Sequence, residues 1–229
     1  MKYFCVMLIF ATTIAGCAPR VSPQIAALPA QTPADFPEAY YRQAESAGRK
    51  VLRVDPNRSL VTIYVRRAGA LARLGHDHVV ASHDVRGYVD LENGRADLYV
   101  ALDRLAVDEP ILRQETGLSA PLSIEAVEGT RRNMLEKVLN AERFPFALIH
   151  VTRTAHDSST LQVIITLHGT SKVFVIPAQI ENMAGGIRIQ GQMTFNQTDF
   201  GITPFSILGG AIQVQDKLDL RFQIHAVEN

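Results

Sequence analysis

The chain has 229 residues, of which 47% are hydrophobic, and its 23 Lys and Arg residues balance its 23 Asp and Glu residues. A chain of this length forms one large domain or two small ones. Because binding to nucleic acid requires a clustered surplus of positive charge, this balance argues against a nucleic-acid partner. Fifteen Gly, eleven Pro and no Trp exclude collagen-like and strongly disordered chains and favour a β-rich domain.

The first residues have the pattern of a secretory signal peptide. Lys2 is followed by an apolar run over residues 3–14 and then by small residues. This run is too short to span a bilayer as a stable helix. The tetrapeptide Ile-Ala-Gly-Cys at residues 14–17 resembles the lipobox of bacterial lipoproteins, in which cleavage occurs before the Cys and the Cys carries the lipid. The alternative is an ordinary secretory signal that is cut nearby. We therefore expect a signal peptide over residues 1–16 and lipidation at Cys17.

Residues 17–50 differ in composition from the rest of the chain. Five prolines are spaced through small and polar residues, at Pro19, Pro23, Pro29, Pro33 and Pro37. Such a composition cannot bury a core and is typical of an extended tether, in which residues 35–47 could form one or two short helical turns. Several acyl chains on Cys17 would hold the protein firmly to a membrane. In the lipoprotein family, Ala18 rather than Asp after the Cys implies the outer membrane. We therefore expect a lipid-anchored envelope protein that faces the periplasm, with a globular domain over residues 51–229.

From about Val51 onward, apolar and polar residues alternate. The last segment shows this best, with Val214, Leu220, Phe222 and Ile224 at even positions and polar residues between them. The pattern is typical of strands with one buried face. Eight strands are predicted, over residues 59–67, 78–91, 95–106, 144–153, 160–168, 172–183, 186–196 and 210–226. Eight antiparallel strands can close into a β-barrel that is filled by side chains or holds one slender ligand, so an all-β fold is expected.

The strand pattern stops between residues 108 and 144. Apolar residues recur there at helical spacing, after Thr130 as a candidate N-cap. They are Met134, Leu135, Val138 and Leu139. The segment therefore predicts a short helical crossover that lies over the barrel.

The apolar rows of the predicted strands define the candidate interior. A long apolar chain is held by burial of its methylene groups, each of which contributes about 0.8 kcal/mol. The same rows could instead fill the barrel completely, and the pattern leaves both interpretations open. The candidate ligand-binding residues are Leu98, Val100, Leu102, Phe195, Val214, Leu220, Phe222 and Ile224.

Three stretches resemble the YceI-like domain proteins, which are bacterial and mostly periplasmic or secreted. Residues 132–147 resemble the family's helix and the strand after it, residues 165–172 (ITLHGTSK) resemble its hairpin, and residues 195–202 (FNQTDFGI) resemble the segment before its last strand. Two positions depart from the family: Val173 stands where Pro is common, and no basic residue precedes Asp199 in the usual place. The resemblance covers the region after the tether. It implies an extended lipocalin-like β-barrel whose interior takes a long-chain amphiphile, such as a polyisoprenoid, a quinone or a fatty acyl chain.

His76 and His78 form the most conspicuous polar pair. On a strand both would project to the same face, which suits a Zn, Cu or Ni ion, with His83 or Asp77 as additional ligands. A closed site needs about four ligands, however, and no Cys follows Cys17. The other interpretations are a polar loop, or a ligand-binding role for His76 and His78 near the lipid headgroup at the mouth of the barrel.

The residue types of a hydrolase triad occur at His168, Ser171 and Asp199, but no nucleophile-elbow motif is present. An Asp in the position of Asp199, before Phe and Gly, is more typical of a turn. We therefore expect no enzymatic activity and no cofactor. Three hypotheses remain: an amphiphile-binding barrel anchored in the envelope, a metal-binding module, and a lipid-anchored structural barrel with a filled interior.

Overall fold

The computed structural model describes residues 31–118, 120–153 and 159–228. The predicted signal peptide and Cys17 lie outside these residues. Thr32–Asn229 form one compact unit. Within the described ranges, no helix combines the length and the apolar character needed to cross a membrane.

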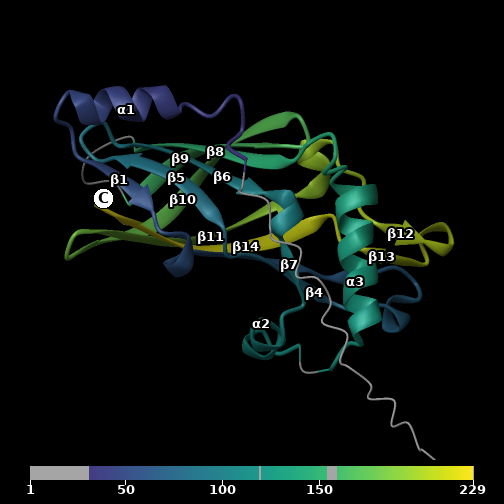
Figure 1. The fold of residues 1–229 in the computed structure, drawn as a ribbon. Coiled ribbons are helices and arrows are strands. Elements are labelled where there is room, and N and C mark those ends of the chain that lie inside the picture. The colour runs from purple at the N-terminus through teal and green to yellow at the C-terminus, as the bar shows by residue number, and fades with distance from the viewer. Residues whose placement is uncertain (1–30, 119, 154–158, 229) are drawn as a thin grey trace, which may run out of the picture. The chain divides into compact units, whose positions relative to one another are not determined.

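Eight antiparallel strands of this unit form a closed barrel (Figure 1). The ring closes where β14 pairs with β1, at Val54↔Ala226 and the pair before it. The predicted all-β barrel is therefore confirmed. The order around the ring is β1 (Val51–Val54), β5 (Val85–Asp90), β6 (Arg95–Ala101), β8 (Phe146–Arg153), β9 (Thr160–Leu167), β10 (Thr170–Met183), β11 (Gly186–Asn196) and β14 (Lys217–Val227).

Beyond the ring, three further strands extend the sheet from the edge of β14. A 3-10 turn at Pro56–Arg58 separates β1 from β2 (Leu60–Val65), and both strands pair with the same edge of β14. β4 (His78–Ser82) pairs with β2, and β7 (Ala106–Val107) pairs with β4. The predicted strand over residues 78–91 is thus two strands, β4 and β5. β1 has no counterpart in the prediction, because its four residues are too few to show an alternation.

The predicted strand over residues 210–226 is also divided. Its first part, β13 (Ile212–Val214), belongs to a separate small sheet with β3 (Arg67–Ala68) and β12 (Ser206–Ile207). The chain then turns at Asp216, whose carboxylate accepts two hydrogen bonds from the neighbouring loop, before β14 begins. Val214 therefore lies outside the barrel wall, which corrects its assignment to the barrel interior.

The predicted helical crossover is confirmed. It consists of α2 (Pro110–Glu115), α3 (Ile124–Asn133) and a π-helical turn at Met134–Val138. Ser123 caps α3, because its hydroxyl accepts a hydrogen bond from the backbone N–H of Ala126 at 3.2 Å. The predicted cap, Thr130, lies inside the helix instead. The residues around α3 and this turn that pack against the barrel core are Val127, Met134, Leu135, Val138 and Leu139.

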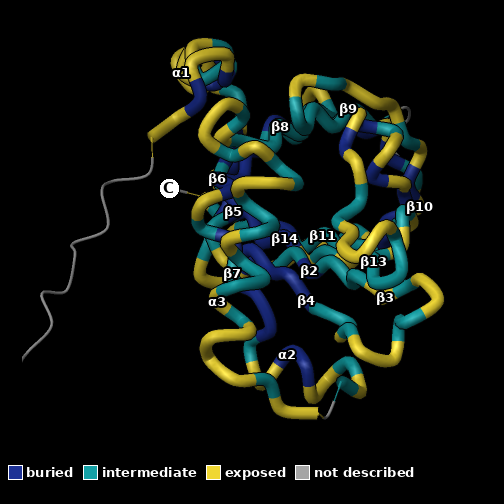
Figure 2. Tube along the Cα trace, turned by 90° about the vertical axis from the view of Figure 1, so that its right-hand side faces the viewer, coloured by how far each residue is buried: buried dark blue, intermediate teal, exposed yellow. Residues whose placement is uncertain are grey.

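Helix α1 (Glu38–Ser46) packs on the barrel, in a part of the chain where the sequence predicts a tether. Its Tyr41 side chain is 1% exposed and donates a hydrogen bond from its hydroxyl to Asp97 Oδ2 on β6 at 2.6 Å. Buried positions, dark blue in Figure 2, are frequent in β5 and β6, and α1 contacts β5. The compact unit begins at Thr32, because the helix adds buried aromatic contacts to the barrel wall.

Candidate functional site

The barrel encloses a cavity of about 220 Å³. Among the described residues that line it, Ser82 alone carries a polar side chain, and the others are aliphatic, Met or Phe. A buried water needs two to four polar partners, so a cavity of this composition does not suit water. Its surface suits a hydrocarbon.

The cavity is long and narrow. Its lining runs from Ala96 to Leu102 along β6 and the start of the turn after it, and from Leu161 to Leu167 along β9. Six residue steps along a strand span about 20 Å. A volume of about 220 Å³ distributed over such a length has the proportions of one slender chain.

Most of the apolar residues predicted to bind a ligand meet at this cavity. They come from three parts of the barrel wall: β6 with the turn that follows it, β11 and β14. Their side chains share the inward face because each strand alternates with a period of two. Val214 is the exception, since it lies in the small separate sheet. The predicted residues that line the cavity are Leu98, Val100, Leu102, Phe195, Leu220, Phe222 and Ile224.

Side chains do not fill this interior. Protein cores are close-packed and contain few voids larger than a water molecule. At about 24 cal/mol per Å³ of unfilled core, a void of about 220 Å³ costs on the order of 5 kcal/mol. That cost is comparable with the whole stability of a small domain. An apolar ligand that fills the cavity would recover much of it, which favours a bound ligand over a structural barrel.

An aromatic cluster packs at one end of the cavity. The rings of Phe195 and Phe200 meet edge to face with centroids 5.6 Å apart, and Phe174 lies 6.2 Å from Phe200. Phe200 ends the 3-10 turn after β11, in which the Asp199 carboxylate accepts a hydrogen bond from the backbone N–H of Asn196 at 3.0 Å. Asp199 thus orders a turn, as its sequence context predicts.

His76 and His78 lie outside the cavity lining. His76 is exposed, whereas His78 Nδ1 lies 2.6 Å from Asp108 Oδ2. The third histidine of the region, His83, pairs with Glu109 at 2.7 Å. Over the part of the chain that the structure describes, His, Cys, Asp and Glu side chains form no cluster of three or more suited to a metal ion. The predicted metal alternative therefore finds no ligand set around His76 and His78.

Asp108 is a buried partner of His78 that sequence reasoning missed. Its carboxylate also accepts hydrogen bonds from Arg113 Nη1 at 2.7 Å and from the backbone N–H of Val79 at 3.1 Å. Burial raises the pKa of Asp108, but the hydrogen bond and charge of His78, together with Arg113, outweigh burial and hold this pKa below its usual value. The backbone of Asp108 has a φ of 56°, a region that Asp enters more readily than most residues. The cluster fixes His78 in place. The available signal was an acidic residue directly after a buried strand.

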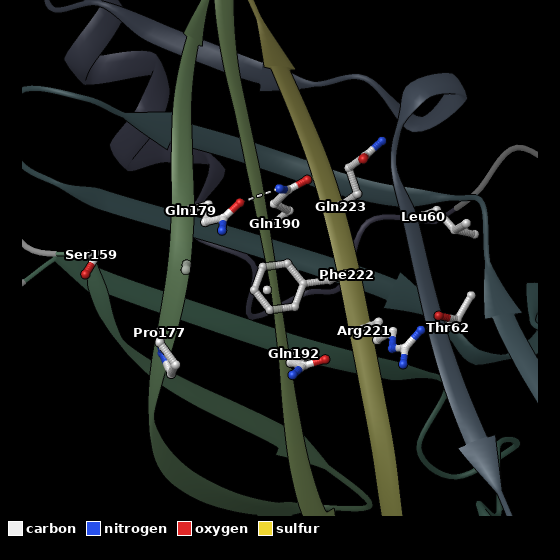
Figure 3. A pocket seen from close by; sticks show the side chains of 12 residues that line it. Leu60, Thr62, Ser159, Pro177, Gln179, Gln190, Gln192, Arg221, Phe222 and Gln223 are labelled. Carbon is white, nitrogen blue, oxygen red and sulfur yellow. Dashed lines mark hydrogen bonds between the residues drawn. The ribbon is translucent and has the colours of Figure 1, made fainter. Parts of the chain in front are cut away.

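The outer face of the barrel carries a groove of about 600 Å³ over β10, β11, β14 and β2 (Figure 3). We call it the amide groove, because four glutamines line it: Gln179, Gln190, Gln192 and Gln223. Arg221 is the one charged residue among the described residues of its lining. These side chains form the polar half of the strand alternation, so the sequence indicates only a solvent-facing surface there.

The residues considered for a hydrolase triad are not joined. Ser171 Oγ lies 2.8 Å from Thr166 Oγ1, and the ring of His168 packs against Phe144 with centroids 4.7 Å apart. No hydrogen bond between described residues connects His168, Ser171 and Asp199 with one another. The arrangement supplies no activated nucleophile at this hairpin.

Comparisons with known proteins find a matching family model and solved structures of the same fold. The family model described as YceI-like domain matches residues 52–226. Among solved structures, a polyisoprenoid binding domain from Saccharophagus degradans, implicated in plant cell wall breakdown, shares 9% identity at a TM-score of 0.57, covering 78% of this chain and 98% of that chain. BcnA from Burkholderia cenocepacia shares 12% identity at a TM-score of 0.51, covering 75% of this chain and 98% of that chain. At such identities these similarities show the fold. A comparison with curated proteins finds no match.

Proposed function

Because the chain belongs to the YceI-like domain family, we propose that it is a lipid-anchored protein of the bacterial envelope that binds or sequesters a long-chain amphiphile inside its barrel. The ligand would be an isoprenoid, a quinone-like lipid or a fatty acyl lipid. The observation that carries this proposal is the cavity of about 220 Å³ with a single polar side chain in its described lining. The fold shared with the polyisoprenoid binding domain from Saccharophagus degradans supports an isoprenoid-type chain.

The energetics of the cavity favour a flexible apolar chain. About ten buried methylene groups would contribute about 8 kcal/mol before the cost of ordering the chain and of association is subtracted. The cavity wall offers Ser82 as its polar side chain, and one hydroxyl without a base or an acid beside it has no means to activate a bond. The proposed role is therefore binding and not catalysis.

The envelope location rests on the beginning of the chain. The apolar run over residues 3–14 and the tetrapeptide at residues 14–17 support export and lipidation at Cys17. Ala18 supports retention at the outer membrane, with the barrel in the periplasm.

The ligand can be identified directly. The full chain would be extracted from bacterial membranes in a mild detergent and measured by native mass spectrometry, and its organic extract would be analysed for lipids. We expect one co-purified long-chain lipid per barrel. Leu98→Trp, which places a large ring in the cavity, should lose this lipid, whereas Ile124→Trp should keep it, because Ile124 is 73% exposed on α3.

Two results would contradict the proposal. One is a wild-type protein that carries no lipid and binds none when it is offered. The other is a folded Leu98→Trp variant with the same lipid content as Ile124→Trp.

A further inference from the structure

β10 and β11 are paired along only part of their described length. Their ladder starts beside the β10–β11 turn and ends at the pair Ala178↔Gly191. Beyond that pair, Thr170–Pro177 pairs with β9, and residues 192–196 of β11 pair with β14. We call the boundary between these two stretches the seam. Figure 3 shows β10 and β11 separating on the side of Pro177 and Gln192.

Pro177 explains why the ladder ends where it does. The backbone N–H of Ala178 donates to Ser159 O at 2.7 Å, on the side of β9. Since successive residues of a strand direct their backbone groups to opposite neighbours, Pro177 faces β11. Proline has no N–H to donate, so a pair between Pro177 and Gln192 would lack one of its two ladder hydrogen bonds, and the ladder ends one pair earlier.

Side chains close the seam from inside the barrel. The ring of Phe222 lies over Gly191: a Cβ at Gly191 would stand 2.7 Å from Phe222 Cζ and 3.0 Å from Pro177 O. Phe174, which points inward from β10, packs against Phe200 at the other end of the seam. Rotation of these rings would open the wall without the loss of a ladder hydrogen bond. The seam is therefore the part of the wall between β10 and β11 that is least costly to open.

A cation lies on the outer face one strand away from the seam. The register places Arg221 next to Gln192, and the other edge of Gln192 borders the seam. Arg221 is exposed, and its guanidinium lies over the ring of Tyr64 at 5.4 Å. The acidic residue on the same face of β14, Asp219, is engaged by Arg66. Arg221 lies in the lining of the amide groove, with its guanidinium on the side of Thr62 (Figure 3).

The groove and the cavity are separated by one layer of wall. Arg221 and Phe222 are neighbours in β14, and their side chains point to opposite faces. Phe222 lines both the cavity and the groove, whereas Arg221 lines the groove and not the cavity. Val175, which stands on β10 beside the seam, is 69% exposed and offers an apolar surface on the outer side. An amphiphile that lies across the seam would meet donors at one end and hydrocarbon at the other.

We propose that the amide groove binds an anionic headgroup, a carboxylate or a phosphate, and that the apolar chain of the same molecule passes through the seam into the cavity. This inference rests on the proposed function and narrows the ligand to an acidic amphiphile. Arg221 binds the headgroup with its planar set of donors, and the glutamine amides add hydrogen bonds. Phe222 turns aside to admit the chain.

Two probes with the same chain and different headgroups test the charge. They are cis-parinaric acid and its methyl ester, whose fluorescence rises in an apolar site, used with delipidated protein at pH 8. Arg221→Gln should weaken binding of the acid about tenfold and binding of the ester less than twofold, because a hydrogen bond to a charged group is lost only with the acid. The matched control is Arg42→Gln, which removes an exposed cation from α1 and should change neither affinity.

The route of the chain is tested by stopped-flow kinetics with the same probes. Phe222→Leu keeps an apolar residue at the seam but removes the ring. It should raise the association and dissociation rate constants of both probes about fivefold, with a smaller change in Kd. The matched control is Ile111→Val, which trims an exposed apolar side chain on α2 outside the cavity lining and should leave both rate constants unchanged.

Several results would overturn this inference alone. They are equal losses of acid and ester in Arg221→Gln, an equal effect of Arg42→Gln, or wild-type rate constants in Phe222→Leu. Inorganic phosphate tests a free anion as the natural occupant. If phosphate alone raises the Tm of the wild type but not of Arg221→Gln, while acid and ester bind equally, the groove is a free-anion site and the inference is wrong. If the wild type binds neither probe and carries no lipid, the proposed function itself fails.

Discussion

Ala147→Leu tests whether the barrel interior is empty space in solution. Ala147 lies on β8, lines the cavity and packs against the main core cluster. The substitution adds three carbon atoms, which contribute about 2.4 kcal/mol at about 0.8 kcal/mol per buried methylene. Imperfect fit removes part of this gain. We therefore expect the delipidated variant to be about 1 to 2 kcal/mol more stable than the delipidated wild type, with a Tm about 4 °C higher.

With lipid bound, the order should reverse. A ligand that binds only the folded state stabilises it in proportion to the logarithm of its concentration over its Kd. The leucine occupies space that the chain would fill, so the variant gains less from lipid than the wild type does. Urea unfolding of both proteins, before and after delipidation, measures their free energies of unfolding and shows whether the more stable protein changes when lipid is bound. Mass spectrometry of the same samples gives the lipid content.

Ala126→Leu is the matched control, because Ala126 is exposed on α3 and the added carbons stay in water. Its free energy of unfolding and its lipid content should equal those of the wild type, with and without lipid. The reasoning is refuted if Ala147→Leu destabilises the delipidated protein by more than about 1 kcal/mol while its lipid content equals that of Ala126→Leu, since overpacking of that size belongs to a filled core.

Cys17→Ser should release the protein from membranes, as measured by fractionation with a high-salt wash. Asp108→Asn should cost about 3 kcal/mol at pH 7 in urea unfolding, because it removes a buried charge from its partners while Asn still tolerates the φ of 56°. The pKa of Asp108 is lower in the folded state than its unfolded value of about 3.9, so its stabilisation is present above that pH and is lost as the pH falls through the folded pKa. Stability of Asp108→Asn should therefore fall less steeply than that of the wild type below about pH 4. The double variant His76→Ala/His78→Ala should keep its lipid content and its metal content, measured by extraction and elemental analysis, because neither residue lines the cavity.

Different outcomes would count against these predictions. A Cys17→Ser protein that still sediments with salt-washed membranes would show another anchor. An Asp108→Asn variant with the wild-type slope below pH 4 would show that this carboxylate gains nothing from folding. Loss of lipid in the folded His76→Ala/His78→Ala variant would place the pair at the ligand.

The period-two alternation was sufficient to predict the barrel and the parts of the cavity wall that β6 and β14 supply. Leu98 and Val100 on β6, and Leu220, Phe222 and Ile224 on β14, share an inward face because each strand is long enough for its pattern to persist. The position of a residue in the alternation does not determine which sheet its strand joins, however. Val214 has the correct parity, but the turn at the start of β14 places it in another sheet.

Contacts between distant parts of the chain could not be predicted from the alternation. Tyr41 meets Asp97 across 56 positions, and His78 meets Asp108 across 30 positions, so neither pair leaves a local spacing to detect. The seam was different, since Pro177 is visible inside a predicted strand and proline in a strand interior indicates an edge or a break. Locating the unpaired stretch beside Pro177 required the register of β10 and β11, which sequence alone does not supply.

Because α1 packs on the barrel, fewer residues remain for the tether between the barrel and its proposed lipid anchor. If residues 17–50 were all tether, the barrel could stand about 110 Å from a lipid on Cys17, at about 3.3 Å per extended residue. Because the compact unit begins at Thr32, the extended reach falls to about 50 Å. An anchored copy could then exchange its cargo only with surfaces inside that radius, so delivery to a more distant membrane would require a second carrier or release from the anchor.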